Sequence, residues 1–350
     1  MPTPADCPPL EVIVPHGRDD FADYRGGVPA PAAGAHAPVN FHALAAASGG
    51  CFHRTTATVP RSSRHVLVLV PRRAGRALRA LRALRRRGHA VLVGWKECGA
   101  HQIAAQLERW FAGARWRALL AECDAVLAAS PAAEAFFDAR DDARGKLVVL
   151  PTPYPLEVGA WDFSQPLEAR AGILVGTREP GVPSRRHAGA VALALRAARA
   201  AGTHVTVLQA GPEVVRPGGD AGGGAADGQP DLRVVAGPLP YADYLRLMAR
   251  HRVVVQRDTS AVPGQVAGDA LLCRMPCLGG NGMVDRIAFP FLPAADDGDD
   301  DVLAAAVALL RDPDAWRTAV ARSQRLAAER LSFAAFARHW RGIASRMAAG

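Results

Sequence analysis

The chain has 350 residues, of which 49% are hydrophobic, and a formal net charge of +9 at pH 7. This length exceeds what one hydrophobic core usually serves, so we expect two domains of about 150 residues each. No stretch reaches eighteen apolar residues, and the first residues lack the charged and apolar regions of a secretory signal. We therefore expect a cytoplasmic protein without a membrane-spanning helix.

The positive charge comes almost entirely from arginine, because Lys96 and Lys146 are the only lysines in the sequence. A basic balance favours an anionic partner, which leaves nucleotides, phosphorylated lipids, membrane surfaces and nucleic acids open. The six cysteines include no C-x-x-C pair. Scattered cysteines of this kind are typical of reduced, buried thiols.

Strand patterns alternate with helix patterns in the first half, which predicts a parallel sheet covered on both faces. The expected strands are 11–14, 55–59, 65–70, 90–95, 125–130 and 146–150. The expected helices are 74–87, 102–122 and 132–139. Ser130 and Pro131 open the last of these helices as its cap and first-turn residue. Residues 18–50 are rich in Gly, Pro and Ala, and we expect irregular structure there.

The same alternation returns after a proline-rich segment, and it is followed by a helical tail. The expected strands are 172–177, 204–211, 232–239, 252–258 and 277–280, and the expected helices are 187–201, 241–250 and 264–274. A Gly-rich surface loop is expected at 212–230, and the tail at 299–347 should break at 312–313 and 331–332.

The predicted fold class is α/β, with two doubly wound Rossmann-like domains and a C-terminal helical tail. We place the N-terminal domain at 1–155 and the second domain at 171–330. The linker is expected at 156–170, and the C-terminal helix at 331–350. In such sheets, ligands bind in the crevice outside the carboxyl ends of the strands.

Chemistry-bearing residues follow the strand ends of the second half. Arg178 follows the run GILVGT, Asp258 ends the run VVVQRD, and a GGNG turn follows at 279–282. A guanidinium fork suits a diphosphate, and glycine lets backbone N–H groups approach an anion closely. The alternatives are solvated surface arginines and an ordinary tight turn.

A family resemblance emerges from these segments taken in order: GILVGTREPGVPSRRH, LRVVAGPLPYADYLRLMARHRVVVQRD, TSAVPGQVAGDALLCRMPCLGGNG and LLRDPDAWRTAVARSQRLAAERLSFAAFARHW. They resemble the nucleotide-sugar domain of retaining glycosyltransferases with the GT-B fold, in particular glycosyltransferase family 4. The resemblance covers 172–345, and the first half is similar in general plan. It implies transfer of a sugar from a nucleoside diphosphate sugar to a saccharide or lipid-linked acceptor, as in cell-envelope polysaccharide synthesis. We expect the transfer to be metal-independent, because arginines can stabilise the departing diphosphate and the acidic run at 296–301 resembles a surface turn rather than a metal-binding D-x-D loop. The nucleotide sugar is a substrate, and no other cofactor is implied.

The resemblance also assigns roles to several positions. Arg178 resembles the arginine that holds the donor diphosphate, and Arg185 or Arg186 stands where the family has a lysine. Gly264 and Asp269 match the glycine and the second carboxylate of the family's paired-glutamate motif. That match implies that Asp269 contacts the ribose.

The first family glutamate falls on Ala261, which departs from the family pattern. Asp258 is therefore our candidate for the carboxylate near the sugar, and Gly280 is our candidate for the close approach to phosphate. The departure leaves a second class open: a non-catalytic protein that binds a nucleotide sugar or a protein partner. For Asp269, the alternative is an ordinary acidic residue favoured by the helix dipole.

Glu97 is the catalytic candidate of the first half, because it follows the strand 90–95 in the run WKECGAH, together with Lys96 and His101. A carboxylate and an imidazole there could serve as acid or base near the acceptor. The alternative is a helix-capping or surface role for Glu97.

Arginines recur every third residue from Arg73 to Arg85, beside leucines at the same spacing. This pattern predicts a helix that buries leucine and exposes arginine. The helix is either an ordinary solvated surface or a contact with anionic lipid at the inner membrane face, where each arginine adds ~1 kcal/mol. Nucleic acid is disfavoured, because no aromatic residues for base stacking interleave with the arginines.

Overall fold

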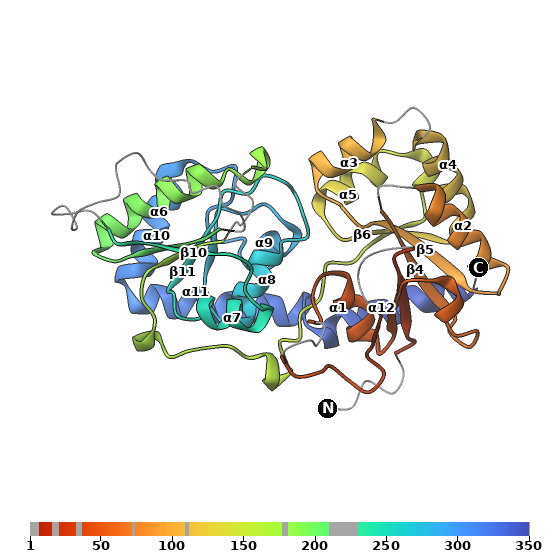
Figure 1. Cartoon of the computed structure of the whole chain (residues 1–350), viewed down its shortest axis with the longest axis horizontal. Coiled ribbons are helices and arrows are strands. Elements are labelled where there is room, and N and C mark those ends of the chain that lie inside the picture. The colour runs from red at the N-terminus through yellow and green to blue at the C-terminus, as the bar shows by residue number, and fades with distance from the viewer. Residues whose placement is uncertain are drawn as a thin grey trace. The chain divides into compact units, whose positions relative to one another are not determined.

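The computed structural model describes residues 7–15, 21–32, 37–71, 74–108, 112–176, 181–209 and 230–349. The chain divides into two compact units, each a sheet flanked by helices (Figure 1). Unit 1 comprises Met1–Trp161, Ala261–Pro263 and Ala328–Gly350; unit 2 comprises Asp162–Ser260 and Gly264–Ala327. The C-terminal helix therefore clusters with the N-terminal unit. The domain boundaries expected from the sequence stay predictions.

The described part of unit 1 contains a seven-stranded sheet in the order β2-β3-β1-β4-β5-β6-β7. Only the pair of β2 and β3 is antiparallel among the pairings of the described strands. The strands are β1 Leu10–Ile13, β2 Ala22–Asp23, β3 Cys51–His53, β4 His65–Val70, β5 Ala90–Trp95, β6 Ala125–Ala128 and β7 Leu147–Val149. Continuous Val- and Leu-rich runs such as β4 are typical of parallel strands that are buried on both faces.

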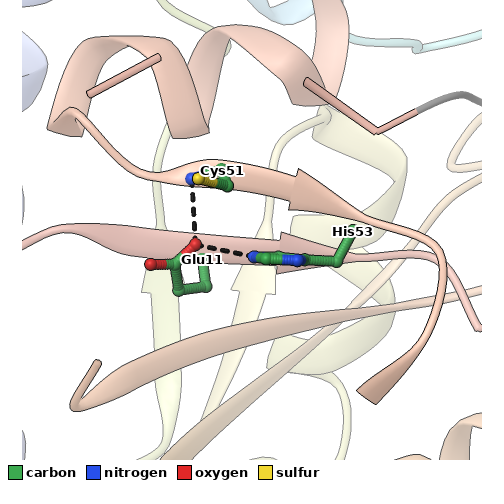
Figure 2. A group of neighbouring side chains, drawn as sticks. All are labelled: Glu11, Cys51 and His53. Carbon is green, nitrogen blue, oxygen red and sulfur yellow. Dashed lines mark hydrogen bonds and ion pairs between the residues drawn. The ribbon is translucent and has the colours of Figure 1, made fainter. Parts of the chain in front are cut away.

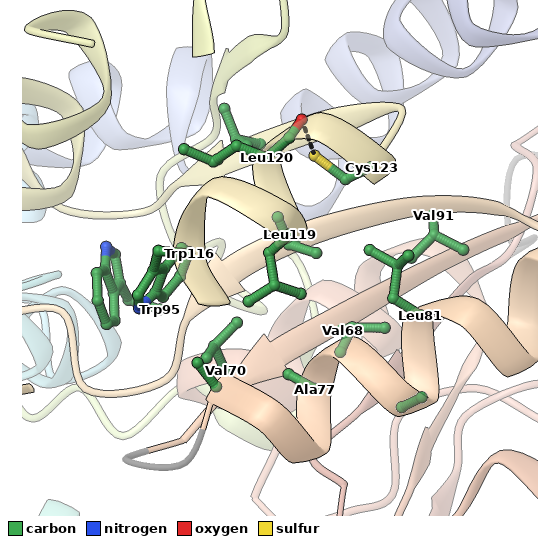
Figure 3. Close-up of a cluster of buried hydrophobic side chains, with 14 of the residues drawn as sticks. Val68, Val70, Ala77, Leu81, Val91, Trp95, Trp116, Leu119, Leu120 and Cys123 are labelled. Atoms are coloured by element: carbon green, nitrogen blue, oxygen red, sulfur yellow. Dashed lines mark hydrogen bonds between the residues drawn. The ribbon is translucent and has the colours of Figure 1, made fainter. Parts of the chain in front are cut away.

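Helices cover both faces of this sheet, as the alternation of elements predicts. They are α1 Asn40–Ser48, α2 Ala74–Arg85, α3 Ala100–Leu107, α4 Ala112–Glu122, α5 Pro131–Asp138 and α12 Phe333–Ala349. One core cluster contains residues of α2, α4 and α5, and the other contains residues of α1 and α12. Figure 3 shows part of the first cluster, where Leu81 of α2 and Leu119 of α4 lie with Val68 of β4. The rings of Trp95 and Trp116 lie 3.8 Å apart in the same cluster.

Three local expectations for unit 1 are wrong. Residues 55–59 were expected to form a strand, but Thr56–Thr58 form a 3-10 turn, η1, and the strand is Cys51–His53 just before it. The segment expected to be irregular contains α1, whose alanines are strong helix formers and whose C-cap is Gly49 at φ 68°. The single helix expected at 102–122 is two helices, α3 and α4.

The described part of unit 2 contains a five-stranded parallel sheet in the order β10-β9-β8-β11-β12. Its strands are β8 Ile173–Val175, β9 Val205–Gln209, β10 Leu232–Ala236, β11 Val253–Val255 and β12 Cys277–Leu278. Its helices are α6 His187–Ala201, α7 Tyr241–Met248, α8 Gln265–Leu272, α9 Met283–Ala288, α10 Asp299–Arg311 and α11 Pro313–Arg330. The strand order reverses between β8 and β11, which makes this pair the topological switch point.

The expected helix at 187–201 is confirmed as α6, and both expected breaks in the tail are confirmed. The loop expected at 212–230 lies outside the described residues, except for Pro230. None of the helices in the described ranges has the length and apolar character needed to cross a membrane.

Candidate functional site

The loops that follow β8 and β11 are joined to each other at the switch point of unit 2. Ser184 lies in the 3-10 turn η5 (Pro183–Arg185), which directly precedes α6. The Thr259 amide donates to the Ser184 carbonyl oxygen at 2.8 Å, and the Thr259 hydroxyl donates to the same oxygen at 3.0 Å. The hydroxyls of Ser184 and Ser260 are 2.8 Å apart. These bonds fix the two loops at the edge where α/β sheets bind ligands.

An ion pair between Arg185 and Asp258 lies across these loops. Arg185 Nη1 donates to Asp258 Oδ2, and the Ser260 amide donates to Asp258 Oδ1 at 2.8 Å. The side chain of Asp258 is 6% exposed and that of Arg185 is 20% exposed. Charge-assisted bonds of this kind are strong and directional, so Asp258 orients the guanidinium. The sequence predicted both residues for the site, and the structure brings them into contact.

The carboxyl group of Asp285 is buried against the GGNG turn at 279–282. Asp285, in the first turn of α9, has Gly264, Gly280 and Gly282 around it, and its Oδ1 accepts from Gln256 Nε2 at 2.8 Å. A Cβ added to Gly280 would lie 2.1 Å from Oδ1, and one added to Gly282 would lie 2.7 Å from Oδ2. Glycine is therefore required here by the close approach of the Asp285 side chain.

The surroundings of Asp285 raise the pKa of its carboxyl group strongly. Burial, with the negative charge of Asp258 as the next cause, raises the pKa of Asp285 to about 7. The sequence reasoning missed Asp285. The available signal was an acidic residue in the first turn of a short helix directly after the GGNG run.

Gly264 and Asp269, the two positions matched to the paired-glutamate motif, lie at the start and in the middle of α8. Gly264 is the N-cap of α8 at φ 94°, a left-handed conformation that favours glycine. Asp269 is fully buried, and its Oδ1 accepts from the Tyr241 hydroxyl. The contact of Asp269 with a ribose stays a prediction.

The other predicted positions of the second half are placed as follows. Arg178 lies outside the described residues. Arg186 is exposed and forms the N-cap of α6 at φ 44°. Ala261, where the family has a glutamate, has φ 49°, and its carbonyl oxygen accepts from the Ala132 amide at 3.3 Å.

Glu97 is bound to the first turns of α3. Its Oε2 accepts from Gln102 Nε2 at 3.0 Å, and its backbone oxygen accepts from Gln106 Nε2 at 3.0 Å. Gln102 Oε1 in turn accepts from the Gly99 amide at 2.9 Å, and this bond caps the N-terminus of α3. These contacts fit the alternative structural role of Glu97, and its catalytic role stays a prediction.

Unit 1 holds a second buried polar cluster, which sequence reasoning missed. Glu11, Cys51 and His53 lie together on β1 and β3 (Figure 2). Burial raises the pKa of Glu11, but hydrogen bonds from His53, Ser63 and the Cys51 amide outweigh it and lower the pKa to about 2. Burial, followed by the charge of Glu11 and a hydrogen bond to Asp23, raises the pKa of the Cys51 thiol to about 12. The available signal was the Cys-x-His spacing, which places both side chains on one face of a strand.

No family model matches the sequence, and no curated protein matches it. Solved structures do match. Sucrose-phosphate synthase from Thermosynechococcus elongatus is 15% identical, with a TM-score of 0.58 over 97% of this chain and 99% of that one. Anabaena HepE in complex with UDP is 10% identical, with a TM-score of 0.58 over 98% and 100% of the two chains. The trehalose-6-phosphate synthase OtsA is 12% identical, with a TM-score of 0.56 over 83% and 73%.

Identities this low show the fold alone. The structural neighbours are GT-B glycosyltransferases, and the alignments with two of them cover nearly the whole of both chains. The expected fold class is confirmed: this chain has the α/β GT-B fold, with two Rossmann-like domains and a C-terminal helix.

Proposed function

We propose that this protein is a glycosyltransferase that uses a nucleoside diphosphate sugar as donor. The observation that carries the proposal is the Arg185–Asp258 pair, which is mostly buried at the switch point of unit 2. The likeness to glycosyltransferases supports it, and two of the similar structures are complexes of HepE with UDP-glucose and with UDP. By its resemblance to glycosyltransferase family 4, we infer a retaining reaction.

The chemistry requires stabilisation of the departing diphosphate, because its negative charge grows in the transition state. Arg185 lies one residue before the N-cap–α6 junction at Arg186 and His187, and the positive end of a helix dipole and its first-turn N–H groups favour an anion. We infer that Arg185 binds the diphosphate and that Asp258 positions its guanidinium. Arg178, outside the described residues, and Arg186, at the N-cap of α6, are proposed to complete the cationic site. With this charge supplied by side chains, the proposed transfer is metal-independent.

We expect Arg185→Ala to weaken binding of the nucleoside diphosphate by about 1.5–3 kcal/mol, the range for a hydrogen bond to a charged group. Calorimetric titration with UDP and with GDP measures the affinity. Arg199→Ala is the matched control, because Arg199 is exposed in the last turn of α6, at the end of the helix away from Arg185. Arg185→Lys keeps the charge but loses the planar fork, so its affinity for the nucleotide should lie between that of the wild type and that of Arg185→Ala. Unchanged affinity in Arg185→Ala would remove Arg185 from the site.

A donor screen separates catalysis from binding alone. Incubation with several nucleotide sugars should release free nucleoside diphosphate if the protein transfers or hydrolyses the sugar. The second candidate function, a non-catalytic protein that binds a nucleotide sugar or a protein partner, is favoured by Ala261, which stands in place of a family glutamate. Binding without release in every case would support that candidate, and absence of binding to every nucleotide sugar would contradict the donor proposal.

We further propose a cytoplasmic enzyme at the inner membrane face that acts on a lipid-linked or saccharide acceptor of cell-envelope polysaccharide. The support is the basic helix α2, where Arg79 and Arg82 are exposed. The structure limits this support: Arg82 forms a two-pronged ion pair with Glu122 of α4, and Arg85 lies 3.7 Å from Asp124. Part of the arginine stripe is therefore neutralised within unit 1.

We expect Arg76→Gln with Arg79→Gln to remove roughly 2 kcal/mol of attraction to anionic vesicles at low salt. Co-sedimentation with phosphatidylglycerol vesicles at two ionic strengths measures this attraction. Arg325→Gln with Arg330→Gln on α11 changes the net charge equally and should have little effect. Wild-type protein that remains in the supernatant at low salt would identify α2 as an ordinary solvated helix.

A further inference from the structure

Three potential metal ligands face one another on the sheet of unit 1. Cys51 and His53 are two residues apart on β3, so their side chains lie on the same face. The parallel register pairs Val12 with Phe52, which sets Glu11 of β1 beside Cys51 on that face. Figure 2 shows the three side chains converging from the two strands. Each residue is 0% exposed.

The separations are close to those that a tetrahedral ion needs. One ligand atom from each residue lies within 4.8 Å of the other two, and His53 Nε2 is 2.8 Å from Glu11 Oε2. Zinc bonds of 2.0–2.3 Å at tetrahedral angles require ligand atoms about 3.3–3.8 Å apart. An ion therefore requires the His53–Glu11 contact to open by about 0.5 Å. Cys51 Sγ, within 4.8 Å of the other two ligand atoms, has to move inward by at most about 1 Å, which side-chain rotation can supply.

The outer contacts orient these ligands. The Thr58 hydroxyl donates to the Thr55 carbonyl oxygen at 3.0 Å, so at its 2.9 Å contact with His53 it accepts from Nδ1–H. That arrangement turns Nε2 toward Glu11. The Ser63 hydroxyl donates to Glu11 Oε1 at 2.7 Å and leaves Oε2 facing His53. Metal-binding histidines commonly donate their second N–H to an oxygen in this way.

His53 Nε2 and Glu11 Oε2 face each other at 2.8 Å, and the Cys51 side chain lies on the same face of the sheet. A divalent metal at this point engages both of these atoms and the Cys51 sulfur. The local charge allows a metal: Zn²⁺ with one carboxylate and one thiolate is neutral, and Arg25, 3.5 Å from Glu11, has a side chain that is 48% exposed and can turn to solvent.

We propose that Glu11, Cys51 and His53 bind a zinc ion that joins β1 to β3. Sulfur, imidazole nitrogen and carboxylate oxygen are the three ligand types that Zn²⁺ uses in proteins, and a water completes the tetrahedron. Because the ligands are buried and lie on adjacent strands, the ion stabilises unit 1. The proposal is independent of the donor site in unit 2 and of the metal-independent transfer proposed there.

Cobalt is the probe, because a Co²⁺–thiolate bond gives a near-ultraviolet charge-transfer band and tetrahedral Co²⁺ absorbs in the visible. The full chain is stripped with a chelator and titrated with Co²⁺. We expect both absorptions to saturate at one equivalent and to disappear when Zn²⁺ is added. With free Zn²⁺ 100-fold above the dissociation constant, the melting temperature should rise by about 5–10 °C.

Cys51→Ser should lose the charge-transfer band, and Cys123→Ser should keep it. Cys123 is the matched control, because it is another buried cysteine of the same unit with its Sγ bonded to the Leu120 carbonyl oxygen. A wild-type protein that gives no band overturns the proposal without any variant. A band that survives in Cys51→Ser or vanishes in Cys123→Ser places the metal elsewhere and overturns it too. Should Cys51→Ser not fold, His53→Gln replaces it, and retention of the visible tetrahedral spectrum in that variant counts against the site.

Discussion

Gly280→Ala is expected to destabilise unit 2 by about 3 kcal/mol. The new Cβ would lie 2.1 Å from Asp285 Oδ1 and 2.4 Å from Gln256 Nε2, so one of these buried groups must move. Overpacking of a closed site typically costs 1–3 kcal/mol, and here it also breaks the 2.8 Å bond between the two side chains. Urea denaturation followed by circular dichroism measures the loss.

Gly189→Ala is the matched control for this change. Gly189 lies on α6, and nothing lies within 4 Å of the position its Cβ would take. Alanine has a higher helix propensity than glycine, so this variant should be neutral or slightly more stable. If Gly280→Ala unfolds at the same urea concentration as the wild type, the claim that Asp285 requires glycine at position 280 is wrong.

The fold could be predicted from the sequence wherever local preference and tertiary environment agree. Helix α6 was predicted with its observed bounds because an alanine-rich run ends at Gly202, which adopts the left-handed C-cap conformation. Residues 55–59 show the opposite case. Their β-branched side chains favour a strand, but β1 pairs with Cys51–His53 instead, and β propensity depends on such pairing.

The site could be predicted only in part, because its contacts join residues far apart in the chain. Arg185 was predicted from its place near a family lysine, and Asp258 from the end of an expected strand. Their ion pair, however, spans 73 residues and depends on two loop conformations. The sequence offered two interpretations of the GGNG turn, an approach to phosphate and an ordinary tight turn, and the approach to phosphate stays a prediction. The structure adds that two of its glycines make room for Asp285. No local sequence pattern distinguishes a glycine that admits a phosphate from one that admits a buried side chain, because both bring another group close to the backbone.

Asp285→Asn is expected to change how stability depends on pH. The pKa of Asp285 is raised from 3.8 to about 7 in the folded protein, so the folded state holds the proton more tightly than the unfolded state does. The stability from this group is complete below the unfolded pKa and is lost as pH rises through 7. Relative to Asp285→Asn, the wild type should therefore lose roughly 2 to 3 kcal/mol between pH 5 and pH 8, from 1.36 kcal/mol per pKa unit.

Urea denaturation of both proteins at pH 5, 6, 7 and 8 measures this difference, and groups common to both cancel in the subtraction. Asn keeps the size of the side chain and an oxygen for Gln256, so the variant should fold and be the more stable protein at pH 8. Asp314→Asn serves as the control, because the Asp314 side chain is 90% exposed and its removal should leave the pH profile parallel to that of the wild type. A difference between Asp285→Asn and the wild type that stays constant from pH 5 to pH 8 would mean that Asp285 is ionised throughout.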